Sequence, residues 1–183
     1  MADQISSDDV LDFWAELGDE GWWKKDLDVD AKIQERFGTL HQQACDGQLA
    51  AWETTSNGAL ALIILLDQFS RNMFRGSPKS FSQDALALEI AKRAIDKGLD
   101  KDCREELRVF FYLPYEHCEA IAEQEKSVQL QHSIRSSEES LKAALEHRDI
   151  VRRFGRFPHR NPVLGRHTTP AEQAFLDGGG FKG

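Results

Sequence analysis

Arginine and histidine side chains gather in one stretch near the C-terminus of this sequence. Between Arg148 and Arg166 there are six arginines and a single acidic residue, Asp149, whereas the whole chain has a formal net charge of -8. Pro158 and Pro162 fix the backbone φ angle at two points and stiffen the stretch. Planar guanidinium groups bind carboxylates and phosphates through two parallel hydrogen bonds. The stretch therefore predicts a rigid loop that recognises an anion through Arg156, His159, Arg160 and Asn161.

The apolar spacing before this loop predicts a helix over residues 137–154. Its inward face consists of His147, Ile150, Val151 and Phe154. We therefore expect His147 to point toward the core. Arg152 flanks that face and joins the predicted ligand-binding side chains, and Asp149 is expected to pair with Arg153 four residues later.

A second candidate motif follows the most apolar stretch of the chain, residues 59–66. Asp67 comes directly after this stretch, and an acidic side chain at such a position needs a partner. Arg71 lies four residues further on the same helical face and Arg75 one turn beyond it. Two interpretations stay open: a salt bridge that holds the end of the core helix, or an arginine held at a pocket wall.

A third motif places two carboxylates and an imidazole close together. Glu116 and Glu119 are three residues apart, with His117 between them. The spacing lacks the Glu-x-x-His pattern of di-iron helical bundles, so we predict no metal. The carboxylates can instead interact with a helix N-terminus or pair with arginines, and Glu116 remains a candidate ligand-binding residue.

These side chains must be positioned by helices, because apolar residues recur at helical spacing along almost the whole chain. We predict an all-α fold of about eight helices in a single domain over residues 1–183, with a frayed tail at 177–183. Antiparallel helix hairpins would stack upon one another. The expected helices cover residues 7–18, 30–46, 59–74, 82–97, 101–113, 115–134, 137–154 and a segment capped by Thr169. A buried strand is the alternative for 59–66.

Composition excludes several classes of protein. The negative net charge argues against nucleic-acid binding, and no apolar stretch approaches the roughly 20 residues of a membrane span. The N-terminus lacks the basic start and apolar core of a secretory signal. Cys45, Cys103 and Cys118 cannot all pair within one chain and fit no zinc spacing. We expect a cytoplasmic protein with reduced thiols and no cofactor.

The ordered motifs LDQFSRNMFRG, FYLPYEHCE, RFGRFPHRN and TPAEQAFL resemble those of a bacterial family called domain of unknown function 924. The resemblance covers nearly the whole chain. It implies a tetratricopeptide-like α-α superhelix and no assigned activity. The chain departs from the family pattern at Ser70, where proline is expected, and at Cys118, where serine is expected.

Three functional hypotheses follow. The first is a binding module for an anionic small molecule or an acidic protein segment. The second is an enzyme in which His117, His147 or His159 is the acid or base. The third is a structural role, in which the arginines bond internal acids such as Asp67 and Glu116 and an apolar surface makes a homodimer. The predicted ligand-binding residues are Asp67, Arg71, Arg75, Glu116, Arg152, Arg156, His159, Arg160 and Asn161.

Overall fold

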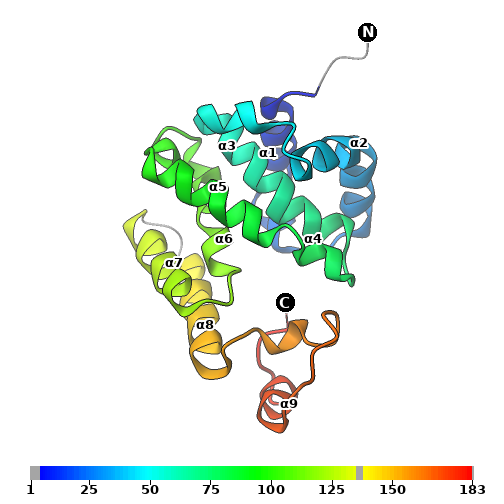
Figure 1. The fold of residues 1–183 in the computed structure, drawn as a ribbon, viewed down its shortest axis with the longest axis vertical. Helices are drawn as coiled ribbons and strands as arrows, with labels where there is room; N and C mark the ends of the chain where they lie inside the picture. Colours follow the sequence, from blue (N-terminus) through cyan, green and yellow to red (C-terminus); the bar gives the residue numbers. More distant parts are fainter. Residues whose placement is uncertain (1–4, 135–137, 183) are drawn as a thin grey trace. The chain divides into compact units, whose positions relative to one another are not determined.

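Helices account for the regular structure in the computed structural model, which describes residues 5–134 and 138–182 (Figure 1). No β-strand occurs within these residues, so the all-α prediction is confirmed. The chain divides into two compact units. The N-terminal unit comprises Met1–Arg75 and Lys79–Pro114, and the C-terminal unit comprises Gly76–Pro78 and Tyr115–Gly183. The single domain and the tetratricopeptide-like superhelix stay predictions.

One buried helical run forms the centre of the N-terminal unit. It consists of α3 (Ser56–Ile63), the π-helical segment η2 (Ile64–Phe69) and α4 (Ser70–Met73). Every residue from 59 to 66 is buried. A helix that is apolar all round must be covered on all sides, and the prediction of a central helix rather than a strand is confirmed.

The other helices of this unit surround that run. α3 packs against α1 (Ser7–Trp23) and α5 (Asp84–Asp96), and α2 (Leu27–Cys45) packs against η2 and α4. The ring of Phe69 lies at the centre of the contact, with its centroid 5.1–6.1 Å from those of Phe13, Trp14 and Phe37. Two short 3-10 segments, η1 (Ala50–Thr54) and η3 (Pro78–Phe81), belong to the connections.

A kink at Gly18 interrupts α1 at the residue where the sequence predicts the first helix to end. The helix begins after Ser6, which forms a capping box with Asp9. Gly18 adopts φ 63° and ψ -179°, a conformation open to glycine, and the chain then continues helically to Trp23. The indole Nε1 of Trp22 donates a 2.6 Å hydrogen bond to the carbonyl of Trp14. This bond fastens the last turn against the body of the helix.

The predicted α-helix over 101–113 is wrong. The chain there forms two 3-10 segments, η4 (Leu99–Lys101) and η5 (Glu105–Phe111). The short α6 (Leu113–Glu116) follows and contains Pro114. Proline lacks the amide hydrogen of a helix interior and is tolerated in a first turn. It therefore lies inside the start of a new helix and does not close the old one.

The predicted helix over 115–134 is interrupted, and α7 (Ile121–Ser133) begins later. The side-chain amide of Gln124, which is fully buried, explains part of this break. Its Nε2 lies 2.6 Å from the carbonyl oxygen of Glu116 and 2.7 Å from that of Cys118. The Gln124 side chain thus bonds one carbonyl group at the end of α6 and one in the loop that follows. In a continuous helix, backbone amides would bond these two carbonyl groups.

The C-terminal unit contains a pair of packed helices, α7 and α8 (Glu138–Phe154), followed by η6 (Pro158–Arg160) and α9 (Pro170–Asp177). The capping box predicted at Thr169 is present, with Glu172 as its partner. The final segment also contributes to packing, because Phe181 lies against the core formed by Ile150, Val151 and Phe157. The prediction of fraying at 177–183 stays a prediction, and Gly183 lies outside the described residues.

Over the described parts of the chain, no helix is both long enough and apolar enough to cross a membrane. Within the described residues no disulfide bond joins Cys45, Cys103 or Cys118. Cytoplasmic location and a homodimer stay predictions.

Candidate functional site

Arg71 is held by two carboxylates. Its Nη1 lies 3.1 Å from Asp67 Oδ1, as the spacing predicts, and 2.8 Å from the Asp67 carbonyl oxygen. Asp84 accepts two further bonds, at 2.9 and 3.0 Å. Asp67 is fully buried. The guanidinium therefore faces two internal acids, and the second of them lies in a different helix.

Arg75 is paired in the same way, with an acid that the sequence motif does not contain. Its Nε and Nη2 lie 2.8 and 2.9 Å from the two carboxylate oxygens of Asp30. Asn72 donates a further bond of 2.8 Å. Burial alone would raise the pKa of Asp30, but the bonds from Arg75 and Asn72 outweigh it and the pKa is lowered. This carboxylate is therefore held in its charged form.

His147 faces the interior of the C-terminal unit, as predicted, and is 7% exposed. Its Nδ1 lies 2.8 Å from the carbonyl oxygen of Ala143, which can only accept, so Nδ1 carries the proton. The same nitrogen lies 3.4 Å from Glu116 Oε1. The structure thus joins two of the predicted site residues in a buried contact.

His159 lies close to His147, and the ring of Phe181 contacts both. The ring centroids of Phe181 and His159 are 5.1 Å apart, and those of Phe181 and His147 are 4.5 Å apart. The pKa of His159 is lowered to about 3, mainly by burial and in smaller part by the charges of Arg160, His147 and His117. A general acid or base works best with a pKa near the working pH. His159 is neutral near pH 7 and does not meet that condition.

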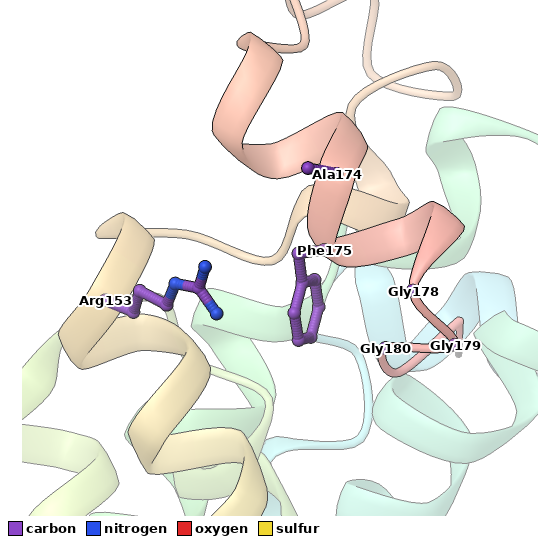
Figure 2. Close-up of a pocket in the computed structure, with 6 residues that line it drawn as sticks. All are labelled: Arg153, Ala174, Phe175, Gly178, Gly179 and Gly180. Carbon is purple, nitrogen blue, oxygen red and sulfur yellow. The ribbon is translucent and has the colours of Figure 1, made fainter.

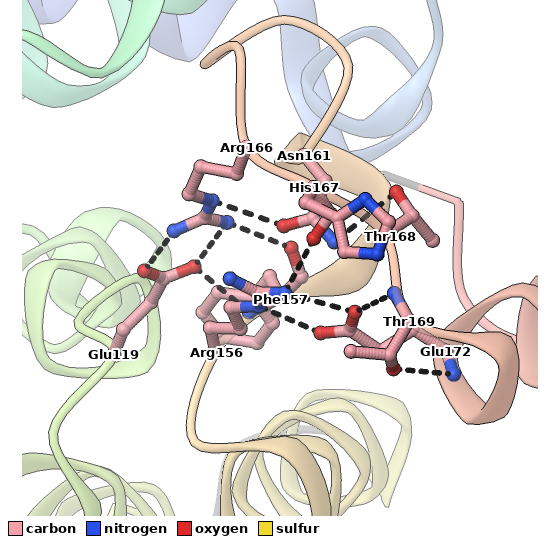
Figure 3. A network of polar contacts seen from close by, with 9 residues as sticks. All are labelled: Glu119, Arg156, Phe157, Asn161, Arg166, His167, Thr168, Thr169 and Glu172. Carbon is pink, nitrogen blue, oxygen red and sulfur yellow. Dashed lines mark hydrogen bonds and ion pairs between the residues drawn. The ribbon is translucent and has the colours of Figure 1, made fainter.

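Arg156, predicted to contact a ligand, is bound to Glu172 (Figure 3). The two side chains share bonds of 2.6 and 2.9 Å, and Arg156 also donates 2.7 Å to the His167 carbonyl. The bond from Arg156 lowers the pKa of Glu172 to about 2, assisted by bonds from Thr169. The same carboxylate therefore caps α9 and binds the arginine.

Arg166 and Glu119 form the other half of this network (Figure 3). Arg166 donates two hydrogen bonds to the Glu119 carboxylate, at 2.6 and 2.9 Å. It donates two more at 3.0 Å, one to the carbonyl oxygen of Phe157 and one to Asn161 Oδ1. Glu119 accepts the Phe157 amide at 2.8 Å. Arg160 is buried with its guanidinium 4.5 Å from the Phe157 ring centroid. The predicted recognition loop is thus bound to its own unit at several points.

Arg153 differs from these arginines. The expected pair with Asp149 is wrong, because Asp149 instead contacts Arg148 at 2.8 Å and Arg152 at 3.5 Å. Arg152 also pairs with Glu125. Among the described residues no carboxylate forms an ion pair with Arg153.

The guanidinium of Arg153 instead lies over the rings of Phe154 and Phe175. It borders an open hollow, together with Phe175 (Figure 2). It is 4.6 Å from the ring centroid of Phe154 and 5.7 Å from that of Phe175. The hollow has a volume of about 390 Å³ and is lined by Arg153, Ala174, Phe175, Gly178, Gly179 and Gly180. The sequence gives no local signal for this site, since the lining segments are separated by a loop.

The predicted site residues therefore fall in two groups. In the N-terminal unit Asp67 lies in η2 and Arg71 in α4, and Arg75 follows the C-terminal end of α4. The C-terminal unit holds Glu116, Arg152, Arg156, His159, Arg160 and Asn161. Within the described residues, no group of three or more His, Cys, Asp or Glu side chains is arranged to hold a metal.

The helical fold and the ordered motifs define a family of all-helical bacterial proteins. Residues 10–180 match the family described as "Bacterial protein of unknown function (DUF924)", and the chain belongs to this family. It is similar to a solved structure of a protein of unknown function from Agrobacterium tumefaciens. The identity is 44% and the TM-score 0.90, over 94% of this chain and 97% of that one. No curated protein matches the chain.

Proposed function

We propose that this chain is a helical binding module whose C-terminal unit binds an anionic small molecule at the Arg153 hollow, the space lined by Arg153, Ala174, Phe175 and Gly178–Gly180. One observation carries the proposal: the guanidinium of Arg153 borders a hollow and forms no ion pair with the described residues. A guanidinium presents fixed donors that match the geometry of a carboxylate or phosphate.

The size of the hollow supports a small molecule over an acidic protein segment. Ligand sites for small molecules occupy roughly 300–1,000 Å³, and this space measures about 390 Å³. A protein segment would need a surface of hundreds of square ångströms with several anchoring residues. A single arginine beside two rings fits the smaller partner.

The rest of the Arg/His-rich segment has a structural role in this proposal. The pair of Arg156 with Glu172 ties the loop after α8 to the first turn of α9. The pair of Arg166 with Glu119 ties the same loop to the segment before α7. Because Arg153 is on α8 and Phe175 on α9, these pairs hold the two walls of the hollow in register.

Titration of the full chain with inorganic phosphate tests this function at constant ionic strength, with chloride as the replaced anion. Phosphate at tens of millimolar should raise Tm by roughly 1–3 °C, since a ligand that binds only the folded state stabilises it. Arg153→Gln should abolish the shift. Arg152→Gln, which removes the same charge from the neighbouring residue, should retain it. An equal shift in both variants, or none in the unmodified chain, contradicts the proposal.

A further inference from the structure

The Arg153 hollow contains few groups that can bind an anion besides the guanidinium itself. The three glycines could offer backbone amides, but each of these donates within the chain. Gly178 N donates to the Ala174 carbonyl, Gly179 N to that of Leu176, and Gly180 N to that of Phe175, at 3.0–3.3 Å. The charge of a ligand must therefore be met by Arg153 at one side of the hollow.

The remaining walls are apolar or lack side chains. The Phe175 ring and the Ala174 methyl group supply the apolar surface, and Gly178, Gly179 and Gly180 leave the backbone open to close approach (Figure 2). A bare phosphate or carboxylate ion would touch one end of this space. A ligand that fills the rest needs an uncharged body attached to its anionic group, and a flat body can pack on the Phe175 ring.

The Phe175 ring is held in place before any ligand arrives. A Cβ added to Gly180 would lie 2.5–2.6 Å from three atoms of the ring, so the glycine backbone packs directly against it. Phe154 supports the ring with centroids 5.2 Å apart. A wall fixed in this way loses little conformational entropy when a ligand packs on it.

We infer that the Arg153 hollow selects anions that carry an aromatic ring, such as aryl phosphates or aryl carboxylates. This inference rests on the proposed function, because it assumes that the hollow binds an anion at all. The anionic group pairs with Arg153, and the ligand ring packs on Phe175. Aromatic pairs of this kind, added to the apolar surface that they bury, favour an aryl ligand by about fivefold to tenfold over its alkyl counterpart.

The test compares phenyl phosphate with methyl phosphate, which carry the same charged group on different bodies. Both are titrated into the ¹⁵N-labelled full chain, and the Arg153 Nε–Hε signal is followed together with the backbone amides of Gly178–Gly180. Phenyl phosphate should bind about fivefold to tenfold more tightly. Benzyl alcohol, which has the ring without the charge, should leave the Arg153 signal in place.

Variants of the chain separate the aromatic selectivity of the hollow from anion binding by Arg153. Phe175→Leu should reduce the preference for phenyl phosphate to less than about twofold while methyl phosphate still binds. Arg153→Gln should abolish binding of both. Phe74→Leu is the matched control, because Phe74 in the N-terminal unit is also a partly buried ring beside a cation, Lys79 at 5.8 Å. This control should keep the full preference.

Three results are decisive. Equal affinity for the two phosphates in the unmodified chain overturns the aromatic selectivity but leaves anion binding intact. A preference that survives Phe175→Leu places the ligand ring elsewhere and also overturns the inference. No response of the Arg153 signal to either phosphate overturns the proposed function together with it.

Discussion

The Nε2 atom of His41 lies 2.8 Å from the hydroxyl oxygen of Ser70, and both side chains are buried. Ser70 uses its only proton to bond the carbonyl of Leu66 at 2.6 Å. His41 must therefore donate from Nε2, and its Nδ1 is free of a proton. The thiol of Cys45 lies 3.6 Å from that Nδ1 and donates to it. A chain of hydrogen bonds thus runs from Cys45 and His41 in α2 through Ser70 to the carbonyl group of Leu66 in η2.

Ser70→Ala should destabilise the protein by about 1–3 kcal/mol, because the buried His41 donor would lose its acceptor. Urea unfolding monitored by circular dichroism measures this loss. Ser127→Ala is the matched control, since Ser127 is fully buried in α7 and its hydroxyl has no hydrogen-bond partner among the described residues. That change should be neutral or stabilising. A smaller loss for Ser70→Ala than for Ser127→Ala contradicts this chain of hydrogen bonds.

Arg166→Lys should destabilise the chain by about 1–3 kcal/mol although the charge is kept. A lysine has one ammonium group and cannot reach both Glu119 oxygens, the Phe157 carbonyl and the Asn161 amide at once. Arg104→Lys is the comparison, because Arg104 pairs with the exposed Asp12 at the surface. It should cost less than about 0.5 kcal/mol. Equal effects of the two changes in urea unfolding would show that the network adds no more than a surface pair.

Gly180→Ala should destabilise the C-terminal unit by about 1–3 kcal/mol, because the new methyl group meets the Phe175 ring at 2.5 Å. The double variant Gly180→Ala/Phe175→Leu should recover part of the loss. Gly38→Ala is the contrasting change: within α2 its methyl group meets only the flexible end of Gln34. It should stabilise by up to about 1 kcal/mol through helix propensity. Thermal unfolding of the four proteins tests these signs, and a stable Gly180→Ala chain would contradict the packing.

Local patterns in the sequence predicted several features that lie within one helix or one turn, although the pair expected between Asp149 and Arg153 did not form. The capping box of Thr169 and Glu172, the inward face of His147 and the contact of Asp67 with Arg71 all follow from spacings of three or four residues. Such spacings have a direct geometric meaning on a helix, so they can be read without knowing the fold.

Partners that the fold brings together from distant positions could not be predicted in this way. Arg75 pairs with Asp30, which is 45 residues away. Arg166 and Glu119 are 47 residues apart. The sequence contains each of these arginines and acids, but which of them pair depends on which distant segments the fold brings together. The predicted recognition loop is therefore bonded within its own unit, whereas Arg153, for which the sequence predicts Asp149 as a local partner, borders the hollow.

Stability should fall as the pH is lowered from about 6.5, before the carboxylates begin to titrate. Burial lowers the pKa of His159 to about 3 and also lowers the pKa of His41, both from an ordinary 6.5. Below pH 6.5 the unfolded chain therefore binds protons that the folded chain does not, and stability rises with pH in this window. Each such histidine contributes a slope of up to about 1.4 kcal/mol per pH unit.

The lowered pKa values of Asp30, Glu119 and Glu172 affect stability at lower pH than the histidines do. These three carboxylates contribute fully to the free energy of unfolding above about pH 4.5. The contribution is lost as the pH falls through their pKa values in the folded chain, about 2 for Glu172. Urea unfolding at half-unit steps between pH 7 and 4.5 thus isolates the histidines. His159→Gln should reduce the slope there, and the imidazole signals of His159 should not titrate above pH 5 in NMR spectra. A titration midpoint near 6.5 would show that the ring is open to solvent and would remove the contribution of His159 to the slope.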